Sequence, residues 1–397
     1  MKYKPHDYQK FAVDFIETHP EAAVLLECGL GKTSITLTAL NDLMFDKFEV
    51  RKVLIIAPIR VCKNSWAAEI AKWDHLEGLN YSLVLGSREQ RLAALRQKAD
   101  LYIINRENVQ WLIESSGMPF DFDMVVIDEL SSFKNHQSKR FKALRKVRPF
   151  VKRIVGLTGT PCSNGLMDLW AQFRLLDKGE RLGKRIGQDR DAYFTPDWNG
   201  FTYTPRKGAE KEIYGKIADI SISMKTTDHL TMPELVTTAD RVELDEKAAA
   251  IYKDMEQDMC LDFVRDSITA ANAGVLCGKL TQLASGAVYT DGGNVMRIHS
   301  HKLDALEDLI EAQNGKPVLI AYWYKHERDS IMERFECREI KTDTDIADWN
   351  ASKIPIALIQ PSSAGHGLNL QSGGSTIIWP PCLRIDTKPS ALSFSPT

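Results

Sequence analysis

Short runs of consecutive Val, Ile and Leu residues alternate with helix-like stretches through the first 175 residues of the chain. Helical patterns such as residues 33–43 and 65–72 lie between the runs. Consecutive apolar positions are typical of strands buried on both faces of a parallel sheet. The alternation predicts an open α/β sheet that binds ligands at the carboxyl ends of its strands. The apolar runs occupy residues 22–26, 53–57, 101–104, 124–127 and 154–157.

Beyond residue 175 the composition changes twice. Residues 176–235 are rich in glycine and proline, which predicts an insertion or linker with a small hairpin rather than a core layer. Trp198, Phe201 and Tyr203 could stack on bases or wedge a duplex, but aromatic residues in a small hairpin more often form its own core, which we expect here. Residues 245–285 are helix-like, and the strand–helix rhythm then returns with apolar runs at 318–322, 356–359 and 376–379 and a helix over 327–335.

Two α/β lobes joined by a linker are the simplest interpretation of these patterns. We predict an N-terminal lobe at 1–175, an insertion at 176–235, a second lobe at 236–379 and an aberrant or truncated tail at 380–397.

Composition excludes several classes of protein. The chain has 397 residues, of which 44% are hydrophobic, and its formal charge is 51 − 53 = −2. These values are ordinary for a globular protein and exclude a uniformly basic nucleic-acid coat. The seven cysteines include no Cys-x-x-Cys pair, so neither a zinc site nor a disulfide framework is expected. Without a signal peptide pattern or a run of about 20 apolar residues, we expect a cytoplasmic protein without a membrane anchor.

A glycine-rich segment follows the first apolar run. Its sequence, Glu-Cys-Gly-Leu-Gly-Lys-Thr over residues 27–33, lies where a strand passes into a helix. Glycines at 29 and 31 let backbone N–H groups turn toward phosphate oxygens, Lys32 would hold the β- and γ-phosphates, and Thr33 would bind Mg²⁺. Leu26 stands where the full phosphate-loop pattern has a glycine. The alternative is a glycine-rich turn that caps a helix, and the position of Gly-Lys-Thr favours the phosphate site.

An acidic pair, Asp128 and Glu129, follows the apolar run at 124–127. Asp128 would bind a magnesium ion through oxygen or water, and Glu129 would polarise the attacking water as a general base. The alternative is a solvated strand end, where acidic residues are common. Together with the phosphate loop, the pair favours a nucleotide hydrolase.

These motifs, taken in order with Gln9 and Leu-Thr-Gly-Thr-Pro over 157–161, resemble the superfamily 2 helicases. GLGKT, DELSSFKN, LTGTP and the later SAGHGLNL are similar to the Swi/Snf-related branch, in the form found in phages and prophages. The resemblance covers roughly residues 5–379. It implies two RecA-like parallel-sheet lobes of the P-loop NTPase fold, with a small insertion and an incomplete second lobe. It also implies a DNA-dependent ATPase that moves on double-stranded DNA without sequence preference, using ATP and Mg²⁺.

The resemblance also implies roles for particular residues. Gln9 would read the adenine edge, although taken alone it is a surface amide near the N-terminus. Thr158 and Thr160 would couple the nucleotide to the lobe interface, and the alternative for them is a local turn. The implied nucleotide-binding set is Gln9, Gly29, Gly31, Lys32, Thr33 and Ser34; the catalytic set is Lys32, Asp128 and Glu129; and the metal ligands are Thr33 and Asp128. The nucleic-acid or coupling set is Arg60, Lys63, Asn105, Thr158, Gly159, Thr160, Gly365, Gly367 and Asn369.

A basic stretch stands apart from these motifs. Residues 130–155 contain nine Lys or Arg residues and no Asp or Glu. Contact with a phosphate backbone is favoured over a merely solvated helix face, although a helix would spread these side chains around its axis.

The resemblance to the family ends after the apolar run at 376–379. The family has a helix there with a glutamine and two arginines, one of which reaches the γ-phosphate. This chain instead has Pro380 and Pro381, and Arg384 is its last arginine. We therefore expect a truncated or frame-shifted tail, retained nucleotide binding and reduced hydrolysis. Two alternatives stay open: an RNA-directed helicase of the same fold, and a non-catalytic ATP-dependent nucleic-acid-binding module.

Overall fold

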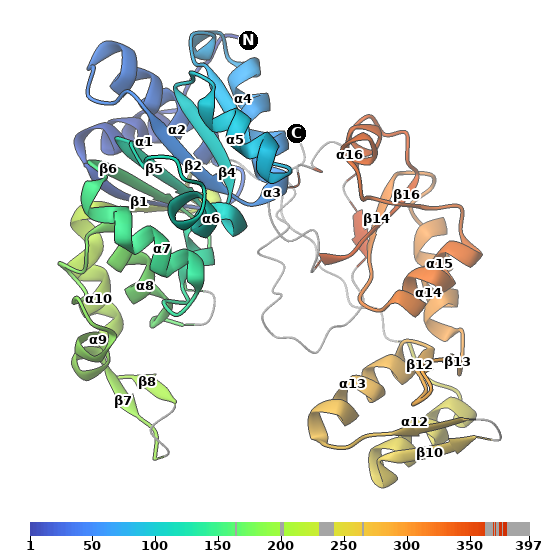
Figure 1. Ribbon diagram of the computed structural model, residues 1–397. Helices are drawn as coiled ribbons and strands as arrows, with labels where there is room; N and C mark the ends of the chain where they lie inside the picture. Colours follow the sequence, from blue (N-terminus) through green and yellow to red (C-terminus); the bar gives the residue numbers. More distant parts are fainter. Residues whose placement is uncertain are drawn as a thin grey trace. The chain divides into compact units, whose positions relative to one another are not determined.

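The computed structural model divides the chain into two compact units, Met1–Met232 and Pro233–Thr397 (Figure 1). The boundaries predicted from composition, at residues 175, 235 and 379, stay predictions. No helix among the described residues is long and apolar enough to cross a membrane. The six cysteines in the described part of the chain are free thiols. The structure describes residues 1–162, 165–198, 202–229, 242–263, 266–361, 368, 370, 373–374 and 376–378.

A seven-stranded parallel sheet forms the centre of the first unit, in the order β3-β4-β2-β5-β6-β1-β9. The predicted α/β fold is confirmed, and all five apolar runs of the first 175 residues are strands. Two further strands, β3 and β9, were not predicted, because serines interrupt their apolar pattern at the two edges of the sheet. The strands are β1 Glu21–Leu26, β2 Val53–Ala57, β3 Tyr81–Val84, β4 Leu101–Asn105, β5 Met124–Asp128, β6 Arg153–Leu157 and β9 Ser221–Met224.

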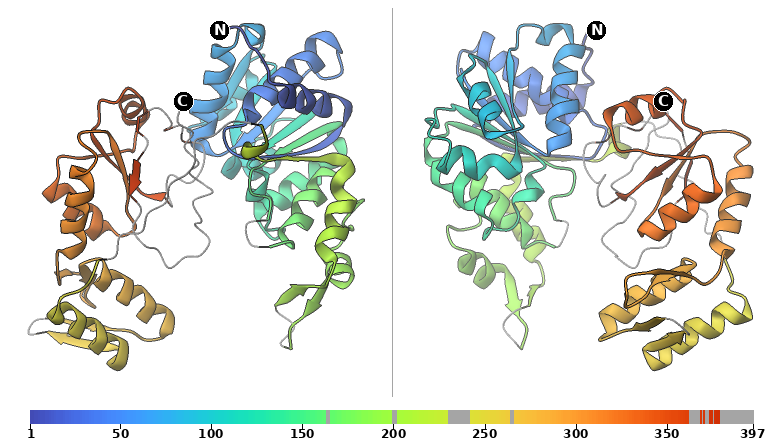
Figure 2. Two further views of the ribbon diagram at one scale, coloured as in Figure 1. Left: turned by 180° about the vertical axis from the view of Figure 1, so that it is seen from behind. Right: turned by 45° about the vertical axis from the view of Figure 1, so that its right-hand side comes forward.

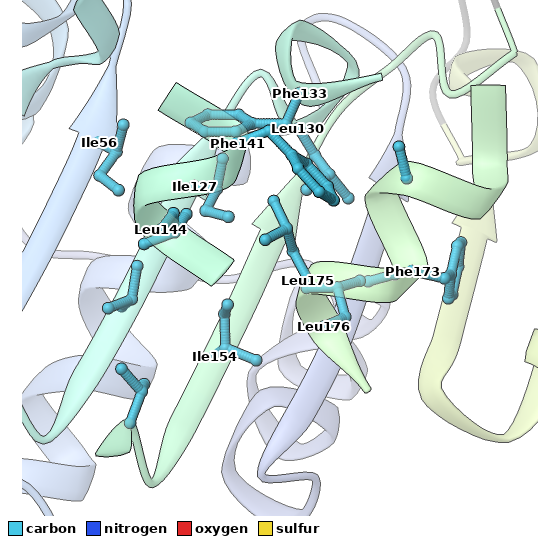
Figure 3. Packing of buried hydrophobic residues seen from close by; sticks show 14 of the residues in the cluster. Ile56, Ile127, Leu130, Phe133, Phe141, Leu144, Ile154, Phe173, Leu175 and Leu176 are labelled. Carbon is cyan, nitrogen blue, oxygen red and sulfur yellow. The ribbon is translucent and has the colours of Figure 1, made fainter. Parts of the chain in front are cut away.

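Helices cover both faces of this sheet. Alternate strand residues point to opposite faces, so Leu54 and Ile56 of β2 belong to one core cluster and Ile55 to the other. On the first face, shown in Figure 3, Ile127 and Ile154 of the sheet lie in one cluster with side chains of α7 and α8. Helices α1 and α2 pack on the second face. The helices are α1 Asp7–Thr18, α2 Lys32–Asn41, α3 Ile59–Val61, α4 Ala67–Lys72, α5 Arg88–Arg96, α6 Val109–Glu114, α7 Lys139–Val147, α8 Asp168–Leu176, α9 Ile186–Tyr193, α10 Ala209–Ile217 and α11 Thr226–His229.

The glycine-rich segment after α8 contains the expected hairpin, formed by β7 (Phe194–Pro196) and β8 (Tyr203–Pro205). Figures 1 and 2 show it extending away from the sheet beyond α9 and α10. The prediction that Trp198 belongs to a core of the hairpin is wrong, because its side chain is 94% exposed. The strands of the hairpin are only three residues long, and Trp198 lies beyond the end of β7. Tyr203 lies beneath the Arg190 guanidinium, and Phe201 is outside the described residues. The same segment also supplies α10 and β9 to the core and sheet, which composition did not predict.

The second unit contains a four-stranded parallel sheet in the order β15-β16-β14-β17. The three apolar runs predicted here are strands, and the helix expected over 327–335 is α15. The helix-like stretch at 245–285 contains two helices as expected, α12 and α13, and the hairpin β10–β11, which was not predicted, separates them. The strands are β10 Cys260–Phe263, β11 Asp266–Thr269, β12 Ala287–Tyr289, β13 Val295–Arg297, β14 Val318–Ala321, β15 Arg338–Glu339, β16 Ile356–Ile359 and β17 Thr376–Ile378. The helices are α12 Glu246–Asp258, α13 Ala273–Ala284, α14 His301–Glu311, α15 Lys325–Arg334 and α16 Asp343–Asn350.

Candidate functional site

The loop between β1 and α2 has a backbone that only glycine adopts readily. Gly29 has φ +87° and Gly31 has φ +78°, in the left-handed region that side chains disfavour. A Cβ atom on Gly31 would also lie 2.7 Å from the side-chain nitrogen of Gln9. Helix α2 begins at Lys32, so the unpaired N–H groups of its first turn adjoin the loop. Backbone N–H groups and the positive end of a helix make this loop suited to a phosphate.

Lys32 folds back over its own loop. Its Nζ donates hydrogen bonds to the carbonyl oxygens of Leu26 at 2.8 Å and Glu27 at 3.1 Å. Thr33 is partly exposed beside it, whereas Ser34 is buried and donates its hydroxyl to the Gly31 carbonyl at 3.0 Å. Lys32 and Thr33 are therefore placed to meet a phosphate, and Ser34 supports the loop from beneath.

Gln9 brings the N-terminal helix against this loop. Its side-chain oxygen accepts the His6 N–H at 3.0 Å, and its side-chain nitrogen donates to the Leu30 carbonyl at 3.4 Å. The amide is buried rather than at the surface. The structure thus brings Gln9 and the phosphate loop together, although they are about 20 residues apart in the sequence.

The acidic pair lies at the end of β5, two strands from β1 in the sheet. The pKa of Asp128 is raised to about 6: burial and the negative charge of Glu129 raise it, and the Trp66 hydrogen bond and the Lys32 charge partly oppose the rise. The Trp66 indole N–H donates to Oδ2 of Asp128 at 2.9 Å. Glu129 has φ +61°, an uncommon conformation for a residue with a side chain. Sequence reasoning missed the contact from Trp66, because a single tryptophan gives no signal of its partner.

Thr158 connects the acidic pair to the next strand. Its hydroxyl donates to Oε1 of Glu129 at 2.9 Å and accepts the Thr160 N–H at 3.1 Å. The Ser131 hydroxyl donates to the same carboxylate oxygen. A Cβ atom on Gly159 would lie 3.2 Å from the Leu26 carbonyl oxygen, so this turn lies against the phosphate loop.

These groups meet because β5, β6 and β1 are adjacent and parallel. Their carboxyl ends carry the acidic pair, the Thr-Gly-Thr turn and the phosphate loop. Among the described residues, no group of three or more His, Cys, Asp or Glu side chains is arranged to hold a metal ion. Mg²⁺ commonly takes one or two protein oxygens together with waters and phosphate oxygens, and Asp128 and Thr33 carry oxygen donors of this kind.

Arg60, Lys63 and Asn105 lie at the ends of β2 and β4, away from the phosphate loop in the strand order. Lys63 is exposed and Arg60 is partly exposed. Asn105 is buried, donates to the Glu107 carboxylate at 3.0 Å and accepts from the Asn108 amide at 2.5 Å. Its side chain therefore shapes the loop after β4, and its role in contacting nucleic acid stays a prediction.

The structure assigns most of the basic stretch to packing and ion pairs. Arg148 is 1% exposed and donates to the carbonyls of Leu175 at 2.7 Å and Val151 at 2.9 Å and to the carboxylate of Glu21 at 2.7 Å. Arg153 is likewise buried and pairs with Glu49 at 2.8 Å. The remaining ion pairs of the stretch are Lys134–Asp168, Lys146–Glu114 and Lys152–Asp123.

Three exposed cations on α7, Lys139, Lys142 and Arg145, form what we call the α7 basic face. None of the three has an ion pair within the described part of the chain. Burial lowers the pKa of His136, and the charges of Arg190, Lys142 and Arg145 lower it further, so cations of α7 and α9 surround one side chain. Such a surface attracts phosphate groups.

Part of the predicted site lies outside the described residues. The residues outside the described part include Gly365, Gly367 and Asn369, and also the tail from residue 379 onward. The expectation of reduced hydrolysis, which rests on that tail, therefore stays a prediction.

Comparison with known proteins gives consistent matches. The family described as the SNF2-related domain matches residues 8–186. The p41 protein of Acyrthosiphon pisum secondary endosymbiont phage 1 is 34% identical over 391 residues, covering 95% of this chain and 85% of that protein. An uncharacterized ATP-dependent helicase of Mycoplasma genitalium is 25% identical over 91% of this chain, which spans 36% of that protein.

A solved structure is similar to this chain in fold. The Sulfolobus solfataricus SWI2/SNF2 ATPase core in complex with dsDNA has a TM-score of 0.50 and 20% identity, covering 96% of this chain and 82% of that one. The likeness extends over most of the chain and shows that both units have the RecA-like α/β fold.

Proposed function

Because this chain belongs to the SNF2-related family and is an ATP hydrolase with a Swi/Snf-like core, we propose that it uses ATP hydrolysis to move along duplex DNA. The observation that carries the proposal is the meeting of three motifs at adjacent strand ends. The Glu129 carboxylate bonds to Thr158, and the turn that follows Thr158 touches the phosphate loop.

The phosphates would lie against the backbone N–H groups of residues 29–33. Lys32 would exchange its two loop carbonyls for β- and γ-phosphate oxygens. Gln9, held beside the loop, would bond the adenine edge. The loop fits a triphosphate because both glycines adopt the positive φ that lets successive backbone N–H groups turn toward one ligand.

Thr33 and Asp128 would hold the magnesium ion, which supplies charge stabilisation to the phosphates when bound. Glu129 would take a proton from the attacking water as general base. Thr158 and Ser131 both donate to Oε1 of Glu129, which fixes the orientation of this carboxylate. A shift of the Thr-Gly-Thr turn would therefore move the base, which gives a route from lobe movement to hydrolysis.

The nucleic-acid contact would be electrostatic. Arg60 and Lys63 would meet one strand, and the α7 basic face would add backbone contacts. Phosphate contacts carry no base information, so binding should be indifferent to sequence and sensitive to salt. Relatives from a phage and a bacterium fit a protein that acts in the cytoplasm of a bacterial or phage-infected cell.

Steady-state ATPase assays with double-stranded DNA, single-stranded DNA or RNA of equal length would test the proposal. We expect the largest stimulation with the duplex and none for Lys32→Ala. Stimulation by RNA alone would favour the RNA-directed helicase. Tight ATP binding without turnover under any condition would favour the non-catalytic binding module. Absence of ATP binding by calorimetry would refute the nucleotide site itself.

A further inference from the structure

The helical segment after β2 contains one wide turn. It begins as the α-helical turn α3, continues as a π-helical turn over Cys62–Trp66, and ends as α4. Such turns are rare, and each inserts one extra residue that rotates the following side chains by about 100° around the axis. The segment therefore presents two differently oriented faces within eight residues.

The inner face carries Trp66. Its side chain is fully buried, and its N–H donates to Oδ2 of Asp128 at 2.9 Å. An indole can only donate, so this contact needs an acceptor such as the carboxylate. Hydrogen bonds to charged groups belong to the strong class, and this one holds one of the two oxygens of Asp128.

The outer face of the same segment carries Arg60 and Lys63, six and three residues before Trp66. Both reach solvent, and neither has an ion pair within the described part of the chain. A phosphate backbone that binds these cations therefore pulls on the helix that also holds the Asp128 carboxylate.

We propose that Trp66 is a positioning residue that links nucleic-acid contact at Arg60 and Lys63 to the orientation of the Asp128 carboxylate. This inference rests on the proposed function, since it needs a nucleic-acid ligand and a metal-binding Asp128. In this arrangement, binding of the backbone aligns the carboxylate for the cation, and nucleic acid stimulates hydrolysis through a single indole N–H.

A matched control lies at the end of the same helix. The N–H of Trp73 donates at 2.5 Å to a carboxylate oxygen of Glu69, which is neither of the two acidic residues of the site. Trp66→Phe and Trp73→Phe therefore each remove one indole-to-carboxylate bond from one helix, and only the first touches Asp128. A second Trp66 variant, with 3-benzothienylalanine at this position, keeps the ring shape and replaces the N–H by sulfur, which serves if the phenylalanine variant does not fold.

The experiment measures ATPase turnover with and without saturating duplex DNA, the half-saturating Mg²⁺ concentration, and DNA affinity by fluorescence anisotropy. We expect either Trp66 variant to lower the stimulation ratio about tenfold, equivalent to about 1.4 kcal/mol. The Mg²⁺ requirement should rise several-fold and DNA affinity should stay within twofold. Trp73→Phe should change none of these quantities.

Two results would overturn the inference alone. One is an equal fall of basal and stimulated turnover in the Trp66 variants, which would mark a purely structural role. The other is an equal effect of the Trp73 variant. A parent protein that nucleic acid does not stimulate would overturn the proposed function as well as the inference.

Discussion

Replacing Asp128 by asparagine should stabilise the protein without nucleotide at neutral and alkaline pH. Burial raises the pKa of Asp128 to about 6 from an ordinary 3.8. A carboxyl whose pKa is higher in the folded state favours folding when protonated, so its contribution is lost as the pH rises from about 4 through 6. The difference corresponds to about 3 kcal/mol of free energy of unfolding above pH 7. Asparagine carries no charge, and its side-chain oxygen still accepts the Trp66 N–H.

The assay compares urea unfolding of the parent and Asp128→Asn at pH 8 and pH 4, with a chelator to remove metal ions. We expect the variant to be about 1–3 kcal/mol more stable at pH 8 and nearly equal at pH 4. Asp123 provides the opposite control. Burial alone would raise its pKa, but hydrogen bonds from Lys152 and from backbone N–H groups outweigh burial and lower it. Asp123→Asn should therefore destabilise the protein at pH 8.

A stabilisation by Asp128→Asn that is the same at both pH values would show that charge is not its cause. Loss of stability at pH 8 would show that the ionised carboxylate is well accommodated without a cation. Either result would refute the reasoning from burial.

Three further outcomes are expected. Lys32→Ala should abolish ATP binding by calorimetry while far-ultraviolet circular dichroism stays unchanged, and parental turnover in this variant would contradict the phosphate site. Thr158→Val should lower kcat about ten- to a hundredfold with little change in KM, because it removes one of the two hydroxyl groups that orient the Glu129 carboxylate. A raised KM at constant kcat would argue for a binding role of Thr158 instead. Lys142→Glu combined with Arg145→Glu should weaken DNA binding for every sequence and reduce the slope of log affinity against log salt by about 2, as measured by anisotropy. An unchanged salt slope would exclude the α7 basic face as a DNA contact.

The strands that sequence predicts well are those whose apolar residues follow one another without interruption. β2 and β4 are of this kind, since neighbours on both sides bury every position. β3 and β9 were missed because Ser82, Ser221 and Ser223 break the pattern, and an edge strand does not need an apolar residue at every position.

Prediction of the site from the sequence is limited in the same way, because it depends on which distant residues meet in the fold. Glycine and lysine at a strand-to-helix junction predict a phosphate loop, because few other functions need that combination of residues. The indole of Trp66 reaches its partner only after β2 and β5 are paired in the sheet. Arg148 and Arg153 look like surface cations in the sequence, yet carbonyl oxygens and carboxylates pair them inside the fold. Pairing between distant segments decides such roles, and local composition does not record it.

The Lys32 ammonium donates hydrogen bonds to two carbonyl oxygens of its own loop. An incoming triphosphate therefore replaces acceptors rather than creating new hydrogen bonds to this group, so their number stays nearly constant. The advantage of the triphosphate over a backbone carbonyl is its negative charge. Selection of ligands at this loop should accordingly follow ligand charge: an uncharged isostere of the terminal phosphate would gain little from the lysine, however well its shape matched.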